Sequence, residues 1–199
     1  MYLRSIKLQG YRSFLEPVSL HLQPEITVLA GPDHCGKTSA LDSIRWCLDD
    51  STDEAVLFRG TDSREPATSA SVSLKFTEAG RTTEISRTVD SATGSALQVQ
   101  GGQANEGIQR MADAVIRITT IDDLEAATRI ESPAILLLDE PEQWLPESEI
   151  QRLSTGLKAA SQLHQIILAT HSKSLMATAD RIIGIIMREF GVSTTMTMS

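Results

Sequence analysis

The chain has 199 residues, 41% hydrophobic and 22% charged, the ordinary balance of one soluble domain that buries a sizeable core. It has no apolar run long enough to span a bilayer and no long apolar stretch near its start, so we expect neither a membrane partner nor a signal peptide. The net charge of −8 argues against a grip on nucleic acid over the whole surface, and two cysteines are too few for a disulfide framework, so we expect a reduced, cytoplasmic protein.

The N-terminal quarter predicts two paired strands and then a buried strand followed by a helix. Alternation of apolar and polar residues predicts strands at 2–8 and 18–22, joined across a turn at 11–17. The apolar run 26–30 predicts a buried strand. Apolar residues in 38–48 recur at helical spacing and predict a helix with one apolar face.

Between that strand and helix the sequence reads G-P-D-H-C-G-K-T, the phosphate-loop pattern G-x-x-x-x-G-K-T. Gly31 and Gly36 let the backbone turn tightly, so that N–H groups point at phosphate oxygens. Lys37 brings a charge to the terminal phosphates, Thr38 supplies a hydroxyl for Mg²⁺, and the helix start adds its positive dipole end. The predicted nucleotide-binding residues here are Gly31, Pro32, Asp33, His34, Cys35, Gly36, Lys37, Thr38 and Ser39.

The middle of the chain is rich in predicted strands and then becomes helical. Segments 71–76 and 82–89 predict an antiparallel pair, and 97–100 a further strand. A small, flexible connector is expected at 101–107. After it, Ile108, Met111, Val115 and Ile118 recur at helical spacing and predict one helix, with a second at 121–129.

The C-terminal third predicts strands that alternate with helices, typical of a parallel sheet. The predicted strands are 134–138, 165–169, 181–187 and 192–198, and the predicted helices are 147–161 and 172–179.

Two of these strands end in residues that suit phosphate chemistry. The first ends in L-L-L-D-E, which places Asp139 and Glu140 at the carboxyl edge of the sheet, where open α/β sheets bind ligands. Asp139 is suited to hold Mg²⁺, and Glu140 to polarise the attacking water as general base. His171 follows the next strand and is suited to sense the γ-phosphate. The predicted catalytic residues are therefore Lys37, Glu140 and His171.

In this order, the phosphate loop, the L-L-L-D-E-P strand end and the A-T-H-S segment resemble ATP-binding-cassette (ABC) ATPases. The resemblance is strongest to the heads of SMC (structural maintenance of chromosomes) proteins and their RecF-like and OLD-like relatives. Residues 6–14 (I-K-L-Q-G-Y-R-S-F) resemble the N-terminal I-x-L-x-G-F-K-S-F of these heads, and 56–60, 179–184 and 189–193 resemble later segments.

This resemblance implies one α/β P-loop NTPase head over residues 1–199. We expect a mixed central sheet flanked by helices and an antiparallel β lobe. Lobe I would cover about 1–100, with a connector at 101–107 and lobe II at 108–199. The long coiled-coil arm of SMC heads has no room here, so the chain is either an armless relative or a head whose arm is replaced by a short linker.

The resemblance also implies further site residues. Arg12 and Ser13 would lie near the base, ribose or phosphates, although the neighbouring aromatic residues can simply pack the β lobe. Gln100 resembles the Q-loop glutamine, which reaches Mg²⁺ and the attacking water. Asn105 and Gly107 resemble a degenerate signature motif, which acts on the nucleotide of a second head. A rival signature is V-Q-G-G-Q at 99–103, and a mere connector also fits this segment.

The expected function is Mg²⁺-dependent ATP hydrolysis to ADP and phosphate, coupled to ATP-dependent homodimerisation of heads. The resemblance places it in DNA organisation, repair or defence, with DNA and a regulatory protein as candidate partners and the nucleoid as a candidate location. The alternative is a nucleotide-gated interaction module with weak or no hydrolysis, since the signature is degenerate. A transporter-type cassette is disfavoured because the sequence lacks a clear L-S-G-G-Q.

Overall fold

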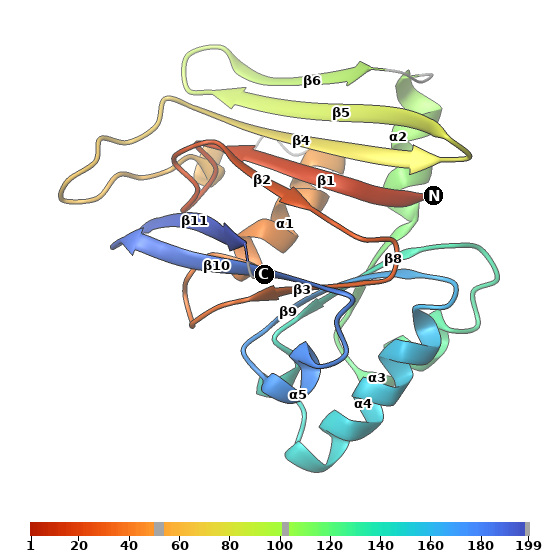
Figure 1. Ribbon diagram of the computed structural model, residues 1–199. Helices are drawn as coiled ribbons and strands as arrows, with labels where there is room; N and C mark the ends of the chain where they lie inside the picture. The colour runs from red at the N-terminus through yellow and green to blue at the C-terminus, as the bar shows by residue number, and fades with distance from the viewer. Residues whose placement is uncertain (50–53, 101–103, 198–199) are drawn as a thin grey trace.

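In the computed structural model, which describes residues 1–49, 54–100 and 104–197, two β-sheets lie on either side of helix α1 (Lys37–Leu48) (Figure 1). The first sheet is antiparallel, with strand order β2-β1-β4-β5-β6. Its strands are β1 (Tyr2–Gln9), β2 (Val18–His21), β4 (Ser69–Glu78), β5 (Arg81–Asp90) and β6 (Gly94–Gln100). A short 3-10 helix, η1 (Glu54–Val56), precedes β4.

The second sheet has the order β11-β10-β3-β9-β8-β7 and is parallel except for its edge strand β11. Its strands are β3 (Ile26–Ala30), β7 (Val115–Ile118), β8 (Ile135–Asp139), β9 (Gln165–Thr170), β10 (Arg181–Glu189) and β11 (Val192–Thr197). The sheet is therefore mixed, as the resemblance implied.

Helices cover both faces of the second sheet. On one face lies α1, beside α2 (Ala104–Asp113), and on the other lie α3 (Ile121–Ala127), α4 (Glu147–Ala160) and α5 (Lys173–Met176) (Figure 1). A short 3-10 helix, η2 (Pro141–Gln143), follows β8. Within the described ranges, no helix is long and apolar enough to cross a membrane.

Side chains of the second sheet point alternately into two hydrophobic cores, one on each face. Leu29, Leu137 and Ile167 point toward α1 and the first sheet, whereas Val28 and Leu136 point toward α4. Because successive strand side chains face opposite sides, the fully apolar strands of the sheet hold both layers together.

The helix predicted from Ile108 to Ile118 is wrong in its second half. The helix α2 ends at Asp113, and Val115–Ile118 forms the edge strand β7, parallel to β8. A strand places Val115 and Ile118 on opposite faces, and the two residues indeed pack into different cores. Pairing with β8 therefore overrides a helical spacing that was carried by only four apolar residues.

The other predicted elements are confirmed to within a few residues, with Met198 outside the described residues. The connector expected at 101–107 is already helical from Ala104, while 101–103 lie outside the described residues. The division into lobes near residue 100 stays a prediction, and the two sheets each combine strands from different parts of the chain. Because β3 lies between β10 and β9, the phosphate-loop strand belongs to the sheet of the C-terminal half.

Candidate functional site

A cleft of about 640 Å³ lies at the carboxyl ends of β3 and β8. Parallel strands that end together bring the loops that follow them to one edge of the sheet. The cleft is lined by Arg12, Ser13, Asp33, His34, Gly36, Lys37, Thr38, Ser39, Glu140 and Gln143. The structure therefore brings most of the predicted binding residues and one predicted catalytic carboxylate to one hollow.

The phosphate loop is packed closely at both of its glycines. Gly36 has a φ of 106°, and a Cβ there would lie 2.6 Å from the Ser193 hydroxyl oxygen. At Gly31, a Cβ would lie 2.2 Å from the carbonyl oxygen of Ile185. Both positions need a residue without a side chain, because the C-terminal hairpin β10–β11 presses against the loop.

The side chain of Lys37 is only 2% exposed and is held by three oxygens. Its Nζ donates to the carbonyl oxygens of Gly31 at 2.9 Å and Pro32 at 2.7 Å, and lies 2.8 Å from Glu140 Oε1. The lysine predicted to bind phosphate and the candidate general base thus form an ion pair inside the cleft.

Thr38 and Asp139 meet directly, although they are 101 positions apart in the sequence. The Thr38 hydroxyl donates to Asp139 Oδ1 at 3.0 Å, and the other Asp139 oxygen lies 3.3 Å from Arg117 Nη2. Burial raises the pKa of the Asp139 carboxyl above its usual value, against the opposing effects of Thr38 and Arg117. A hydroxyl beside a buried carboxylate is an oxygen donor pair of the kind that Mg²⁺ prefers.

Glu140 has a left-handed backbone with a φ of 45°, which is uncommon for a residue with a Cβ. Its N–H donates to the Ala169 carbonyl oxygen at 2.9 Å, and its carboxylate accepts from the Gln143 amide and pairs with Lys37. Strained backbone of this kind persists where the surroundings impose it, and it clusters at functional sites. Here it turns the Glu140 side chain into the cleft.

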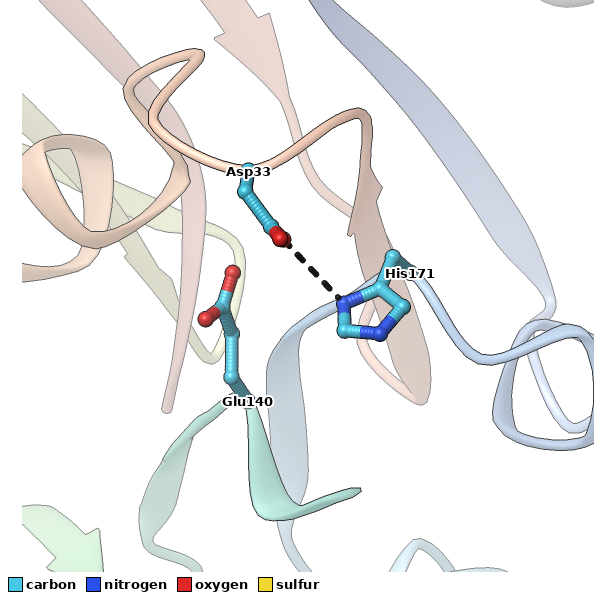
Figure 2. A group of neighbouring side chains, drawn as sticks. All are labelled: Asp33, Glu140 and His171. Atoms are coloured by element: carbon cyan, nitrogen blue, oxygen red, sulfur yellow. Dashed lines mark ion pairs between the residues drawn. The ribbon is translucent and has the colours of Figure 1, made fainter. Parts of the chain in front are cut away.

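Figure 2 shows His171 facing Asp33 across the cleft edge, with Glu140 beside them. Nδ1 of His171 lies 3.5 Å from Asp33 Oδ1 and 3.3 Å from Glu142 Oε1. Ligating atoms of Asp33, Glu140 and His171 all lie within 4.8 Å of one another. The histidine therefore lies beside the carboxylates of Asp33 and Glu140.

The loop that carries His171 is anchored by Glu142. One Glu142 oxygen accepts hydrogen bonds from the Thr170 hydroxyl and from the N–H groups of His171 and Ser172. The Glu142 side chain is 11% exposed, and its bonds to Thr170 and Ser172 are partly buried. Through them, η2 after β8 sets the position of the histidine after β9.

Arg12 and Ser13 border both this cleft and a neighbouring hollow of about 360 Å³. Arg12 also pairs with Asp42 at 2.7 Å and lies over the Tyr11 ring. Tyr11 and Phe14 are completely buried in the core around α1. The aromatic pair therefore packs the fold, and Arg12 and Ser13 are the residues of this turn that face the cleft.

Gln100 and Gly107 do not line this cleft. Gln100 is exposed at the end of the edge strand β6 in the first sheet. Asn105 and Gly107 lie in the first turn of α2, as the predicted signature requires. The geometry gives Gln100 no link to Thr38 and Asp139, and Arg117 is the residue that contacts Asp139 instead.

Three residues of the site had no clear signal in the sequence. Ser193 lies 2.7 Å from both the Ser13 hydroxyl and the Cys35 carbonyl oxygen, and its N–H donates to the Ser13 carbonyl. Arg117 gave no signal because the sequence predicts a helix where the structure has strand β7. Gln143, which contacts Glu140, was an unremarkable polar residue after the acidic pair.

Both cysteines are free and buried, in line with reduced thiols. Burial raises the pKa of the Cys47 thiol to about 12 and also raises that of Cys35, which lies in the phosphate loop. Neither is a candidate nucleophile.

The phosphate loop, the acidic strand end and the histidine strand end converge at one edge of a mixed sheet, and an antiparallel sheet is stacked across a central helix. Together these features define a P-loop NTPase head of the ABC type. The RecF/RecN/SMC N terminal domain family matches residues 2–121, and the chain belongs to this family.

Curated relatives and solved structures agree with this assignment. The chain is 36% identical over 90 residues to the chromosome partition protein Smc of Xanthomonas oryzae pv. oryzae. The aligned region covers 41% of this chain and 8% of that protein. It is 27% identical over 154 residues to the Smc protein of Rhodopseudomonas palustris, 68% of this chain and 12% of that protein. The chain thus spans a small part of the length of these relatives.

Among solved structures, the SMC head domain from Thermotoga maritima matches with a TM-score of 0.79 and 20% identity over the whole of both chains. A structure described as the SmcHead bound to the C-winged helix domain of ScpA matches with a TM-score of 0.79 and 18% identity, over 100% of this chain and 98% of the other. The fold is that of an SMC head.

Proposed function

We propose that this SMC-type head binds ATP with Mg²⁺ in the cleft and hydrolyses it to ADP and phosphate. The observation that carries the proposal is the contact of the Thr38 hydroxyl with Asp139 at 3.0 Å, beside the Lys37–Glu140 pair in the same cleft. A metal-ligand pair, a phosphate-binding cation and a candidate base are the parts that phosphoryl transfer to water requires.

The residues present fit a magnesium nucleotide. Thr38 and Asp139 offer hard oxygen ligands, and Gly36 and Lys37 of the phosphate loop line the same cleft. Bound Mg²⁺ would neutralise charge on the phosphates. Lys37 would release the loop carbonyls and contact the terminal phosphates, which frees Glu140 to orient and deprotonate water. His171, held by Glu142, would hydrogen-bond the terminal phosphate.

The hollow that adjoins the cleft suits the nucleoside. It is bordered by Leu57 and Phe58 as well as by Arg12 and Ser13, so it combines apolar surface with polar groups. We place the base and ribose there.

The proposal includes a second copy of the chain. Gly107 does not line the cleft of its own chain, so any contact that it makes with a nucleotide has to be in the cleft of a partner. On the phosphate side, Asp33 is 64% and His171 48% exposed, which leaves that side of the site open for a partner head. ATP would then bind two heads together.

The test of hydrolysis compares phosphate release by the wild type with that of Glu140→Gln. We expect the wild type to release phosphate in Mg²⁺ and the variant to be slower by about 10²-fold or more, while it still binds ATP in isothermal titration calorimetry. Arg152→Gln, a change in an exposed ion pair on α4, serves as the control. Equal rates for the wild type and Glu140→Gln would refute the enzymatic reaction.

Dimerisation is tested by size-exclusion chromatography with light scattering. The Glu140→Gln variant should elute as a dimer with ATP and Mg²⁺ and as a monomer without them. A monomer under both conditions contradicts the shared site.

A chromosome-related role is proposed from the names of the relatives, which are chromosome partition proteins. It would place the protein in the cytoplasm at the nucleoid, with duplex DNA and a winged-helix protein as partners, the latter by analogy with the partner in a matching structure. We expect duplex DNA to bind or to stimulate phosphate release at low salt and to lose its effect as salt rises. No effect at low salt counts against this role.

A nucleotide-gated module without hydrolysis is the second candidate. It is favoured by the degenerate signature motif, in which Asn105 stands where the family pattern has a serine. ATP-dependent dimers that release no phosphate would support this candidate over the enzyme.

A further inference from the structure

Asp139 is bound on both of its oxygens, and only one of these partners belongs to the phosphate loop. Thr38 donates to Oδ1, while the guanidinium of Arg117 lies 3.3 Å from Oδ2. Thr38 is a metal-ligand candidate, but Arg117 is a cation that occupies the second oxygen of the same carboxylate. A divalent ion that binds Asp139 must compete with this charge.

The position of Arg117 follows from the register of the sheet. In the parallel pair β7–β8, Arg117 lies opposite Leu137, two residues before Asp139. Because strand side chains alternate, Arg117, Leu137 and Asp139 all point to the face that carries α1. The pairing of β7 with β8 in this register therefore places an arginine beside Asp139.

Arg117 also contacts a second carboxylate, that of Asp42 on α1. Asp42 is four residues after Thr38 and so lies on the same helix face. Its Oδ1 is 3.3 Å from Arg117 Nη1, and its Oδ2 is 2.7 Å from Arg12 Nη1. Arg117 thus bridges Asp42 and Asp139, and it can give up one carboxylate while it keeps the other.

We propose that Arg117 is a positioning residue that sets how much Mg²⁺ the site needs: it balances the charge of Asp139 and must release Asp139, while it keeps Asp42, before a divalent cation can use Asp139. The inference rests on the proposed binding of a magnesium nucleotide. It adds that the Arg117 guanidinium competes with Mg²⁺ for the Asp139 carboxylate. Asp42 lowers the free-energy cost of this release, because the Arg117 guanidinium stays paired with Asp42 both before and after the cation binds Asp139.

Two substitutions should move the magnesium requirement in opposite directions. Arg117→Gln removes the competing cation, so half-saturating Mg²⁺ should fall by about two- to fivefold, the range expected of a partly exposed ion pair. Asp42→Asn leaves Asp139 as the remaining carboxylate of the bridge for Arg117, so half-saturating Mg²⁺ should rise by a similar factor. Arg152→Gln removes an arginine that also contacts two carboxylates, Glu125 and Glu149, and should change nothing.

The measurement is a Mg²⁺ titration of the fluorescence of a labelled ATP analogue at constant nucleotide, with circular dichroism and thermal melts to establish folding. Opposite shifts for Arg117→Gln and Asp42→Asn support the inference. An unchanged or higher requirement in a folded Arg117→Gln variant overturns it.

A titration of Mn²⁺ without nucleotide, followed by electron paramagnetic resonance, separates this inference from the proposed function. Tighter Mn²⁺ binding by Arg117→Gln than by the wild type supports the competition even if no ATP binds, in which case only the proposed function fails. Equal binding curves in both the Mg²⁺ and the Mn²⁺ titrations contradict the competition itself.

Discussion

At the level of single residues, Gly36 combines a left-handed backbone with a lack of space for a side chain. Its φ is 106°, and a Cβ would lie 2.6 Å from the Ser193 Oγ and 2.9 Å from the Ser13 Oγ. Both hydroxyls are part of the contact that joins the phosphate loop to β11. Gly36 therefore matters for stability as well as for phosphate binding.

We expect Gly36→Ala to lower the free energy of unfolding by roughly 2–3 kcal/mol, from strain at positive φ and from the clash. Gly94→Ala is the matched control, since Gly94 has a φ of 81° but no atom of the described residues lies within 4 Å of the point that a Cβ would occupy. It should cost about 1 kcal/mol, from the backbone alone. Urea denaturation measures both, and equal losses would show that the packing around Gly36 is unimportant.

Asp139 is the second residue with a stability effect of its own. Because burial raises its pKa in the folded protein, the ionised carboxylate is less favourable there than in the unfolded chain. The fold is thus disfavoured at pH values above the raised pKa, and this penalty fades as the pH falls through it toward the unfolded value of about 3.9.

Asp139→Asn should therefore raise the melting temperature at pH 7, and the gain should shrink toward pH 4. Thermal melts of the variant and the wild type across this range provide the measurement. A gain that grows on acidification would contradict the sign of the pKa shift.

At the level of elements, the hairpin β10–β11 completes the phosphate loop from the far end of the chain. The Ser193 hydroxyl lies 2.7 Å from the Cys35 carbonyl oxygen and 2.7 Å from the Ser13 hydroxyl, and Ser193 is completely buried. One side chain on β11 thereby connects the N-terminal turn to the loop.

We expect Ser193→Ala to lower the free energy of unfolding by about 1–3 kcal/mol, because it leaves a shielded carbonyl without this donor. It should also weaken ATP binding, since the loop loses a constraint. Thr195→Ala on the same strand is the control, and chemical denaturation with calorimetric ATP titration gives both quantities. ATP binding equal to that of the wild type would show that β11 does not position the loop.

At the level of the whole molecule, α1 is the element that both sheets share. Ile44 is completely buried in the core that contains side chains of the first sheet, of α1 and of the second sheet. Removal of its side chain therefore weakens both halves together.

Ile44→Ala should cost about 2–5 kcal/mol and keep a single unfolding transition. Trp46, in the same core, and Trp144, after β8, can each be followed by fluorescence once the other is replaced by Phe. Two separate midpoints would show that the sheets unfold independently.

Prediction from the sequence succeeds where chemistry is encoded in adjacent residues. The spacing of Gly31, Gly36, Lys37 and Thr38 predicts a turn between a strand and a helix, and the structure has it. It fails at Val115–Ile118, where four residues cannot distinguish a helix face from a strand and pairing with β8 decides. The roles assigned to Asn105 and Gly107 stay predictions.

Thus the sequence by itself determined the phosphate loop, the two strand ends that carry Asp139, Glu140 and His171, and the alternating order of elements, because short-range spacing specifies backbone geometry and apolar faces. Only the tertiary structure decided that Ser193 supports the loop and that Arg117 binds Asp139. These contacts join segments 158 and 22 residues apart. These contacts exist because strand order and register bring the segments together. A local sequence pattern specifies neither the strand order nor the register.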